Sequence, residues 1–333
     1  MGCSHSPLLA TEPEKWYLRA QADMENPAHP FRGKDYTFDE LLEHRKGENF
    51  VAQNTIEVRR ERHDRNQAIL DRLGEDIKNA NLDVFIIIGD DQYEVFLPDH
   101  MPSFVIYNGE KVLSQATTKE RLAAMHESVS IAHWARVPEA DVLHQGAPEL
   151  ANHVISSMIA DHFDISVSSK MPAGQFGENG VPHFIGFFYH RIMNDLKDQP
   201  NLATFPVFIN TFFAPNQPTA QRVLDFGRSM GKAIRSWDKD LRVGIAASGG
   251  FSHFVIDEEL DERLIKAVTE RDEATLVNEP EYSYQSGTSE IKNWIATMGI
   301  TEGTGLEFEL IDYIPCYRSD AGTGNAMTFG LWK

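Results

Sequence analysis

The stretch IIIGDDQYEVF, residues 86–96, joins a short apolar run to a group of acidic and amide side chains. The apolar run ends at Gly89, and three polar residues follow it: Asp90, Asp91 and Gln92. A short, uninterrupted apolar run is typical of a strand buried on both faces of a sheet. In open α/β sheets, ligands bind just beyond the carboxyl ends of the strands. The stretch therefore predicts a buried strand that leads into a functional loop.

Apolar strands and amphipathic helices alternate along the rest of the chain. Further strands are expected at 103–108, 164–169, 205–210 and 241–248. Helices are expected at 54–80, 118–134, 148–161, 184–196, 219–237 and 289–299. This alternation predicts a single-domain α/β sandwich in which helices flank a mostly parallel central sheet. We expect one catalytic domain over 1–333, with a polar insertion at about 11–50 that contains one short helix at 37–45. A closing tail with one extra strand is expected at about 305–333.

The composition limits the classes of partner. The chain has 333 residues and a formal net charge of -19, so its surface repels nucleic acid and anionic membranes. Its longest apolar runs are far too short to span a membrane. It has two cysteines and no signal peptide, which indicates a reduced, cytoplasmic location.

Polar clusters recur where predicted strands or glycine-rich turns end. They are CSH at 3–5, GDDQ at 89–92, PAGQFGENGVPH at 172–183, SGGFSH at 248–253 and SGTSE at 286–290. Because the ends of parallel strands meet at one edge of a sheet, these clusters could form one site.

Three residues of these clusters are chemically suggestive. His5, His253 and Glu290 supply two imidazoles and a carboxylate, the ligand set of a mononuclear Fe(II) site with open positions. Each residue also has an ordinary explanation: a loop histidine is often simply hydrogen-bonded, and an acid at a helix start interacts favourably with the helix dipole. No P-loop or serine nucleophile elbow is present.

Several of these motifs, taken in order, resemble the class III extradiol ring-cleaving dioxygenases, the protocatechuate 4,5-dioxygenase catalytic-subunit superfamily. The motifs are CSHSPLL, PVFIN, SGGFSH and SGTSEIKNWIATMG. Within the superfamily the chain is most similar to the 3-O-methylgallate dioxygenase type. That similarity rests on FRGKDYTFDELLE, FGENGVPHFIGFFYHRIM, FAPNQPTAQR and GGFSHFVIDEELD.

The resemblance implies an Fe(II) ion held by two histidines and a glutamate. His5 and Glu290 match the first and third of these ligands. The second position normally holds a histidine after an aspartate, but this chain has Asp91-Gln92 there. Gln92 offers only an amide oxygen, a weaker donor than imidazole. We expect Gln92 to complete the site, with His100 and then Asp91 as alternates.

The resemblance also implies the reaction and its catalytic residues. A catechol- or gallate-type aromatic diol would bind the iron and be opened by O2. His253 matches the acid/base histidine, and His183 is the best match for a second catalytic histidine. Phe184, Phe187 and Phe212 are candidates for an aromatic wall. Arg191, Arg222 and Arg318 are candidates for binding a substrate carboxylate.

Two further expectations follow from the resemblance. Related two-subunit enzymes carry a small lid chain, and here the 11–50 insertion and the tail could take that role. One chain type would then form a homodimer or a higher homo-oligomer. The superfamily also contains non-catalytic interaction proteins, and Gln92 keeps that alternative open, as it does a different oxidative chemistry on an altered metal site.

Overall fold

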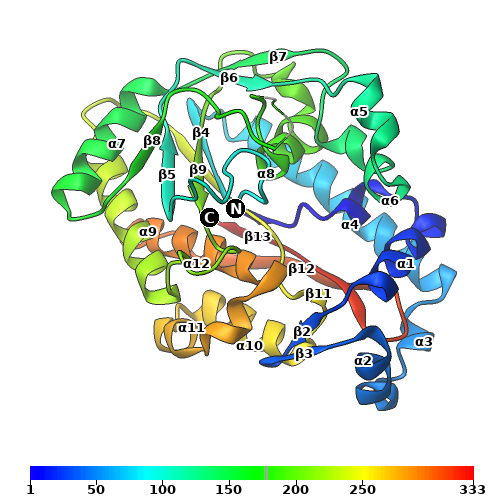
Figure 1. The fold of residues 1–333 in the computed structure, drawn as a ribbon. Coiled ribbons are helices and arrows are strands. Elements are labelled where there is room, and N and C mark those ends of the chain that lie inside the picture. The colour runs from blue at the N-terminus through cyan, green and yellow to red at the C-terminus, as the bar shows by residue number, and fades with distance from the viewer. Residues whose placement is uncertain (176, 178) are drawn as a thin grey trace.

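The fold is built on a nine-stranded sheet with a parallel centre (Figure 1). The computed structural model describes residues 1–175, 177 and 179–333. Four parallel strands form the centre: β1 (Gly2–Cys3), β10 (Val243–Ser248), β4 (Val84–Gly89) and β9 (Ala203–Ile209). The predicted buried strand is therefore β4, and the predicted α/β class with a mostly parallel central sheet is confirmed.

Antiparallel pairs extend the sheet on both sides of this centre. On one side, β5 (Phe104–Tyr107) pairs with β9 in antiparallel orientation, and β8 (Ser166–Ser168) pairs with β5 in parallel orientation. On the other side, β13 (Thr323–Trp332) pairs with β1, with β11 (His253–Val255) and with β12 (Phe308–Tyr317). The tail thus supplies two long strands instead of the single extra strand expected. Because β1 and β13 are paired, the two chain ends lie side by side (Figure 1).

Helices cover both faces of the sheet because β4 is apolar on both. Val84, Ile86 and Ile88 belong to one buried core. That core includes residues of α7 (Pro148–Ala160), α9 (Ala220–Arg235), α10 (Glu258–Glu270), α11 (Glu273–Asn278) and α12 (Ile291–Ile300). Phe85 and Ile87 belong to a second core, together with residues of α4 (Ile56–Asn79) and α8 (His183–Phe187). Successive strand residues alternate between faces, which produces this sandwich.

The 11–50 insertion is more structured than expected. The predicted short helix is α2 (Phe38–His44), which Thr37 begins with a capping box to Glu40. The expected insertion also contains α1 (Tyr17–Glu25) and the hairpin β2 (His29–Phe31)–β3 (Lys34–Tyr36), and α3 (Phe50–Gln53) begins at its end. Arg32 and Gly33 both have positive φ at the hairpin turn. The hairpin packs beside β11, so the insertion borders the edge where the predicted site residues lie.

Two predicted helices are broken in the structure. The 118–134 segment forms α5 (Lys119–Ala124), α6 (Glu127–Ser130) and a separate 3-10 turn. The 184–196 segment continues α8 as a short π-helix and another 3-10 turn. A separate two-stranded antiparallel sheet of β6 (Lys111–Ser114) and β7 (Val142–Gln145) was not expected. Within the described residues, none of the helices is long and apolar enough to cross a bilayer.

Candidate active site

Four buried side chains from four elements meet at one edge of the sheet. His5 follows β1, His183 is the first residue of α8, His253 is the first residue of β11, and Glu290 ends the 3-10 turn before α12. All four line a cavity of about 390 Å³. The structure therefore brings together side chains that are up to 285 residues apart between His5 and Glu290, as expected for strand ends that share an edge.

Glu290 is fixed by the glycine turn after β10. Its Oε2 accepts a hydrogen bond from the Gly250 backbone N–H at 2.8 Å. Its Oε1 lies 3.4 Å from His5 Nε2 and 3.4 Å from His253 Nε2. A Cβ atom at Gly249, where φ is +134°, would lie 2.7 Å from the Glu290 carboxylate, so only glycine allows this approach. The charges of His253 and His5 outweigh burial and hold the pKa of Glu290 well below its ordinary value.

His5 presents its Nε2 atom to the cavity. The Ser248 hydroxyl donates to the Phe184 carbonyl at 2.9 Å and lies 2.8 Å from His5 Nδ1. Because that hydroxyl hydrogen is committed, Ser248 accepts the hydrogen of His5 Nδ1. A neutral His5 therefore carries its lone pair on Nε2, the form that binds a metal ion. Burial, aided by the charges of His183 and His253, lowers the pKa of His5 and favours this neutral form.

His183 is held by a carboxylate that we did not predict to belong to the site. Glu94 accepts the His183 backbone N–H at 3.1 Å and also pairs with Nδ1 of the ring. Nε2 is again left for the cavity. Burial alone would lower the pKa of His183, but Glu94 raises it to about 9. The charge of His183 in turn lowers the pKa of Glu94 against the effect of burial. A carboxylate that accepts the N–H of the other ring nitrogen is the usual support of a metal-binding imidazole.

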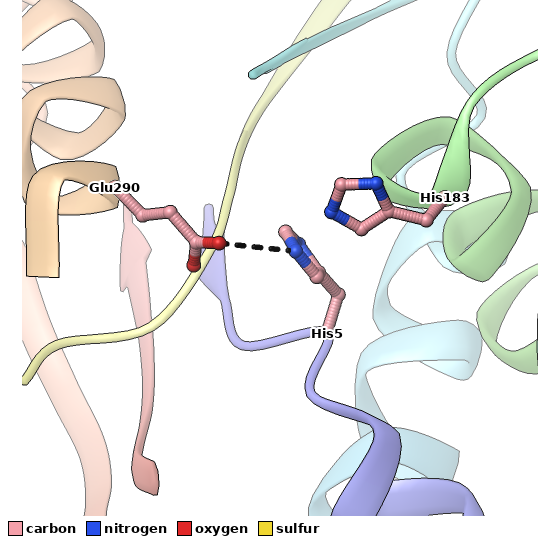
Figure 2. A group of neighbouring side chains, drawn as sticks. All are labelled: His5, His183 and Glu290. Atoms are coloured by element: carbon pink, nitrogen blue, oxygen red, sulfur yellow. Dashed lines mark ion pairs between the residues drawn. The ribbon is translucent and has the colours of Figure 1, made fainter. Parts of the chain in front are cut away.

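His5, His183 and Glu290 form a compact set of possible ligands. One ligand atom from each lies within 4.8 Å of the others. Figure 2 shows the two imidazole rings side by side, with the Glu290 carboxylate directed at His5. The ring centroids are 4.6 Å apart and the rings are nearly perpendicular. Two imidazole nitrogens and a carboxylate oxygen match the facial triad that holds Fe(II) and leaves positions open.

His253 lies outside this set but beside it. Its Nδ1 donates to the Phe251 carbonyl at 2.6 Å, which leaves Nε2 facing Glu290. Its backbone is fastened to the Thr288 hydroxyl through both N–H and C=O. Burial acts to lower the pKa of His253. The charge of Glu290 acts in the opposite direction and outweighs burial, so the pKa of His253 lies above its ordinary value. A fixed imidazole with one free nitrogen is suited to proton transfer.

Asp90 supports the fit of a cation at this site. The side chain is fully buried, and neither carboxylate oxygen has a hydrogen-bond partner among the described residues. Burial and the charge of Glu290 raise its pKa to about 7, whereas His183 and His253 act in the opposite direction. A buried carboxylate without a partner is costly unless a positive charge lies nearby. The residues present therefore fit a divalent metal ion.

The three residues considered for the second ligand position lie in different environments. Gln92 is half-buried and lines the cavity. Asp91 accepts the backbone N–H groups of Val95 and Phe96 at 3.0 and 2.9 Å, so both its oxygens cap the turn. His100 is exposed and does not line the cavity formed by the described residues. Of these three, only Gln92 faces the site.

The candidate substrate-binding residues are only partly placed at the cavity. Of the three arginines considered, only Arg318 lines it, while Phe184, Phe187 and Phe212 do not belong to its described wall. Phe184 and Phe187 pack in the core. Phe176 and Glu178, which belong to the predicted 172–183 cluster, lie outside the described residues. Sequence reasoning missed Glu94, Arg19 and Arg136; of these, only Glu94 lies in the opening stretch, two residues after Gln92.

The sequence of this chain matches a known protein family. Residues 46–318 match the family described as the catalytic LigB subunit of aromatic ring-opening dioxygenase. A gallate dioxygenase of Pseudomonas putida is 31% identical over 114 residues, which is 34% of this chain. The aligned part covers 30% of that relative's length.

Proposed function

The chain belongs to the family of catalytic subunits of aromatic ring-opening dioxygenases, and on that premise we propose that it is an Fe(II)-dependent extradiol dioxygenase. Its substrate is an aromatic diol of the catechol or gallate type, and the second substrate is O2. The likeness to the Pseudomonas gallate dioxygenase supports the diol class. The reaction breaks a ring carbon–carbon bond next to the diol and adds both oxygen atoms of O2 to the product.

One observation carries this proposal: the cluster of His5, His183 and Glu290 on the cavity wall. We assign these three residues as the metal ligands, so His183 takes the position for which we expected Gln92. Three details support His183. Its Nε2 faces the cavity, Glu94 supports its ring, and an imidazole that releases its Nε2 proton to a bound metal is a better ligand than an amide oxygen. The ligand role of Gln92 stays an alternative prediction.

The metal, when bound, orients the diol and O2 and acts as a Lewis acid. The protein groups supply the remaining functions. Glu94 holds the His183 ring in place, and Ser248 fixes the tautomer of His5. His253, whose Nε2 lies 3.4 Å from Glu290, is placed to accept a proton from a substrate hydroxyl and to return it later. The apolar part of the wall, which includes Val129, Val181 and Phe254, limits the access of water to the ring.

Metal binding by single variants tests the ligand assignment. Anaerobically purified protein should bind about one equivalent of Fe(II) at the proposed site. His183→Ala and Glu290→Ala should lose that metal, whereas Gln92→Ala and His100→Ala should keep it. His253→Ala should also keep the metal but lose turnover. Loss of metal in Gln92→Ala with retention in His183→Ala would return the second ligand position to Gln92.

Oxygen uptake separates the enzyme from the alternative of an interaction protein. Fe(II)-loaded wild-type protein should consume O2 with at least one member of a panel of catechols and gallate-type triols. No uptake across the panel, together with no bound iron, would favour a non-catalytic member of the family. Bound iron without uptake on any diol would instead favour a different oxidative reaction at this site.

A further inference from the structure

A short turn after β9 touches the surroundings of two proposed metal ligands. This turn, the β9 turn, consists of residues 210–213 and has the sequence NTFF. None of its four residues belongs to the described wall of the cavity, so it does not itself contact a ligand there. Its contacts instead connect the loop after β4 with the 3-10 turn that carries Glu290.

Tyr93 has an unfavourable backbone conformation between two residues of the cavity wall. Its neighbours Gln92 and Glu94 both line the cavity, whereas Tyr93 does not belong to the described wall. Its φ is +65°, in the left-handed region that large side chains rarely adopt. Such a conformation costs free energy and persists only where surrounding contacts hold it. Because Glu94 follows directly and pairs with the His183 ring, the contacts of Tyr93 affect the position of that ring.

The contact that holds Tyr93 is a stack on Phe213, the last residue of the β9 turn. The two ring centroids are 3.7 Å apart, and the ring planes differ by 12°. The Asn210 side chain accepts the Phe213 backbone N–H at 2.9 Å and donates to the Phe213 carbonyl at 2.8 Å. The Asn210 backbone N–H donates to the Ser103 carbonyl at 2.9 Å. The Tyr93 ring therefore packs against a side chain whose main chain is fixed.

The same turn reaches Glu290 through a pair of buried hydroxyl groups. The Ser289 hydroxyl donates to the Thr211 hydroxyl at 3.0 Å, and both side chains are fully buried. Ser289 directly precedes Glu290 in the 3-10 turn before α12. A buried hydroxyl that loses its partner is destabilising, so this hydrogen bond resists separation of the two segments. Thr211 therefore constrains the main chain that carries the Glu290 carboxylate.

We propose that the β9 turn is a positioning element that sets the geometry between His183 and Glu290 in the metal-binding set. It acts through the aromatic stack on one side and through the hydroxyl pair on the other. Because β9 pairs with β4 and β5 inside the sheet, the turn has a rigid base. This inference rests on the proposed function for the bound metal. The groups that orient metal ligands typically contribute about 10- to 100-fold to affinity.

Metal affinity, measured without turnover, tests both sides of the turn. The probes are Fe(II), titrated under argon against a chelator, and Co(II), whose visible spectrum reports the coordination geometry. Phe213→Leu and Thr211→Val should each weaken Fe(II) binding about tenfold and alter the Co(II) spectrum. Tyr93→Phe keeps the stack and should stay within about twofold of wild type. Wild-type affinity in Phe213→Leu or in Thr211→Val would overturn the proposal, because the turn must act on both ligands.

Variants of Tyr93 separate the effect of the ring from that of the backbone. Tyr93→Gly removes the left-handed strain together with the ring. It should weaken Fe(II) binding as much as Phe213→Leu does. The double variant should lose no more than either single variant, because both changes break the same contact. A Tyr93→Gly protein with wild-type affinity would show that the loop needs no stack, and the proposal would then be wrong.

A second stacked pair provides the control. Phe104 and Phe226 stack in the core with ring centroids 4.3 Å apart, and neither lines the described cavity. Phe226 is fully buried whereas Phe213 is half-buried, so Phe226→Leu should lower the free energy of unfolding at least as much as Phe213→Leu. Its Fe(II) affinity should nevertheless stay within about twofold of wild type. An equal loss of affinity in both variants would indicate a general effect of stability and would overturn the proposal.

A readout that needs no metal distinguishes this proposal from the proposed function. In metal-free protein, the His183 Nδ1–H that pairs with Glu94 should give a downfield proton NMR signal that is absent from His183→Ala. The signal should shift or broaden in Phe213→Leu and stay unchanged in Phe226→Leu. That result in a wild-type protein that binds no Fe(II) would support the positioning of His183 and refute only the metal assignment. An unchanged signal in Phe213→Leu would contradict the link between the stack and His183.

Discussion

Replacing Gly287 with alanine should remove catalysis while leaving the metal in place. A Cβ atom at this position would lie 2.1 Å from Cδ2 and 2.4 Å from Nε2 of His253. Carbon atoms cannot approach so closely, so the imidazole ring must move. The ring is buried and held by the Phe251 carbonyl, so its new position is offset by about 1 Å or more. A displacement of that size at a reacting group can reduce the rate about 100-fold.

The stability cost should be moderate. Inserting one methyl group into a packed region costs about 1–3 kcal/mol. The proposed ligands His5 and His183 are not among the closest atoms to the new methyl group. The dissociation constant for Fe(II), measured by competition with a chelator, should therefore stay within a few-fold of the wild-type value. Gly47→Ala is the matched control, since nothing lies within 4 Å of a Cβ atom there.

A double variant makes the reasoning sharper. In His253→Ala the ring is gone, so the new methyl group of Gly287→Ala has room. The double variant should be no less active than His253→Ala alone. Its loss in free energy of unfolding should be smaller than the sum of the losses in the two single variants. Oxygen uptake and urea unfolding measure both effects. A Gly287→Ala protein with wild-type turnover would refute the role assigned to the position of His253.

Three other substitutions should have measurable effects. Glu94→Gln should weaken Fe(II) binding about 10- to 100-fold, measured by chelator competition, because His183 loses its carboxylate support; unchanged affinity would contradict that role. Asp90→Asn should raise the free energy of unfolding of metal-free protein by about 1–3 kcal/mol at pH 8, since a buried charge is removed; a loss of stability would argue against it. Burial raises the pKa of Asp261 from 3.8 to about 7, so its contribution to stability is complete below pH 4 and is lost as the pH rises through 7. The free energy of unfolding, measured with urea, should fall by up to about 4 kcal/mol over this pH range because of Asp261, and Asp261→Asn should remove that fall. An unchanged pH profile in the variant would count against this role of Asp261.

The fold was predictable where hydrophobic patterns are strong and local. The apolar run that became β4 and the long amphipathic pattern of α4 are visible in the sequence because burial imposes their periodicity. The insertion was harder, because α1 and the β2–β3 hairpin are largely polar and are stabilised by contacts with distant segments such as β11. Propensity alone does not reveal such contacts.

The site was predictable in its members more than in their roles. His5, His253 and Glu290 follow strands or glycine-rich turns, so their convergence was expected from topology. His183 was also expected at the site, within the 172–183 cluster, but not as a possible ligand beside His5, because we expected the second ligand to come from the loop after β4. The acidic stretch after β4 acts through Glu94, which orients His183, and through Asp90, which adds negative charge. Those contacts depend on how α8 packs over the end of β4. The pattern of a single sequence does not reveal the distance between α8 and that strand end.

Isotope labelling tests the central claim most directly. Protein loaded anaerobically with Fe(II) is mixed with a gallate-type diol and 18O2, and the product is analysed by mass spectrometry. The proposed reaction predicts a ring-opened product that carries both labelled oxygen atoms, with one O2 consumed for each diol, and no such product from the Glu290→Ala variant. An intact ring, or a product without label from iron-loaded wild-type protein, would contradict the account.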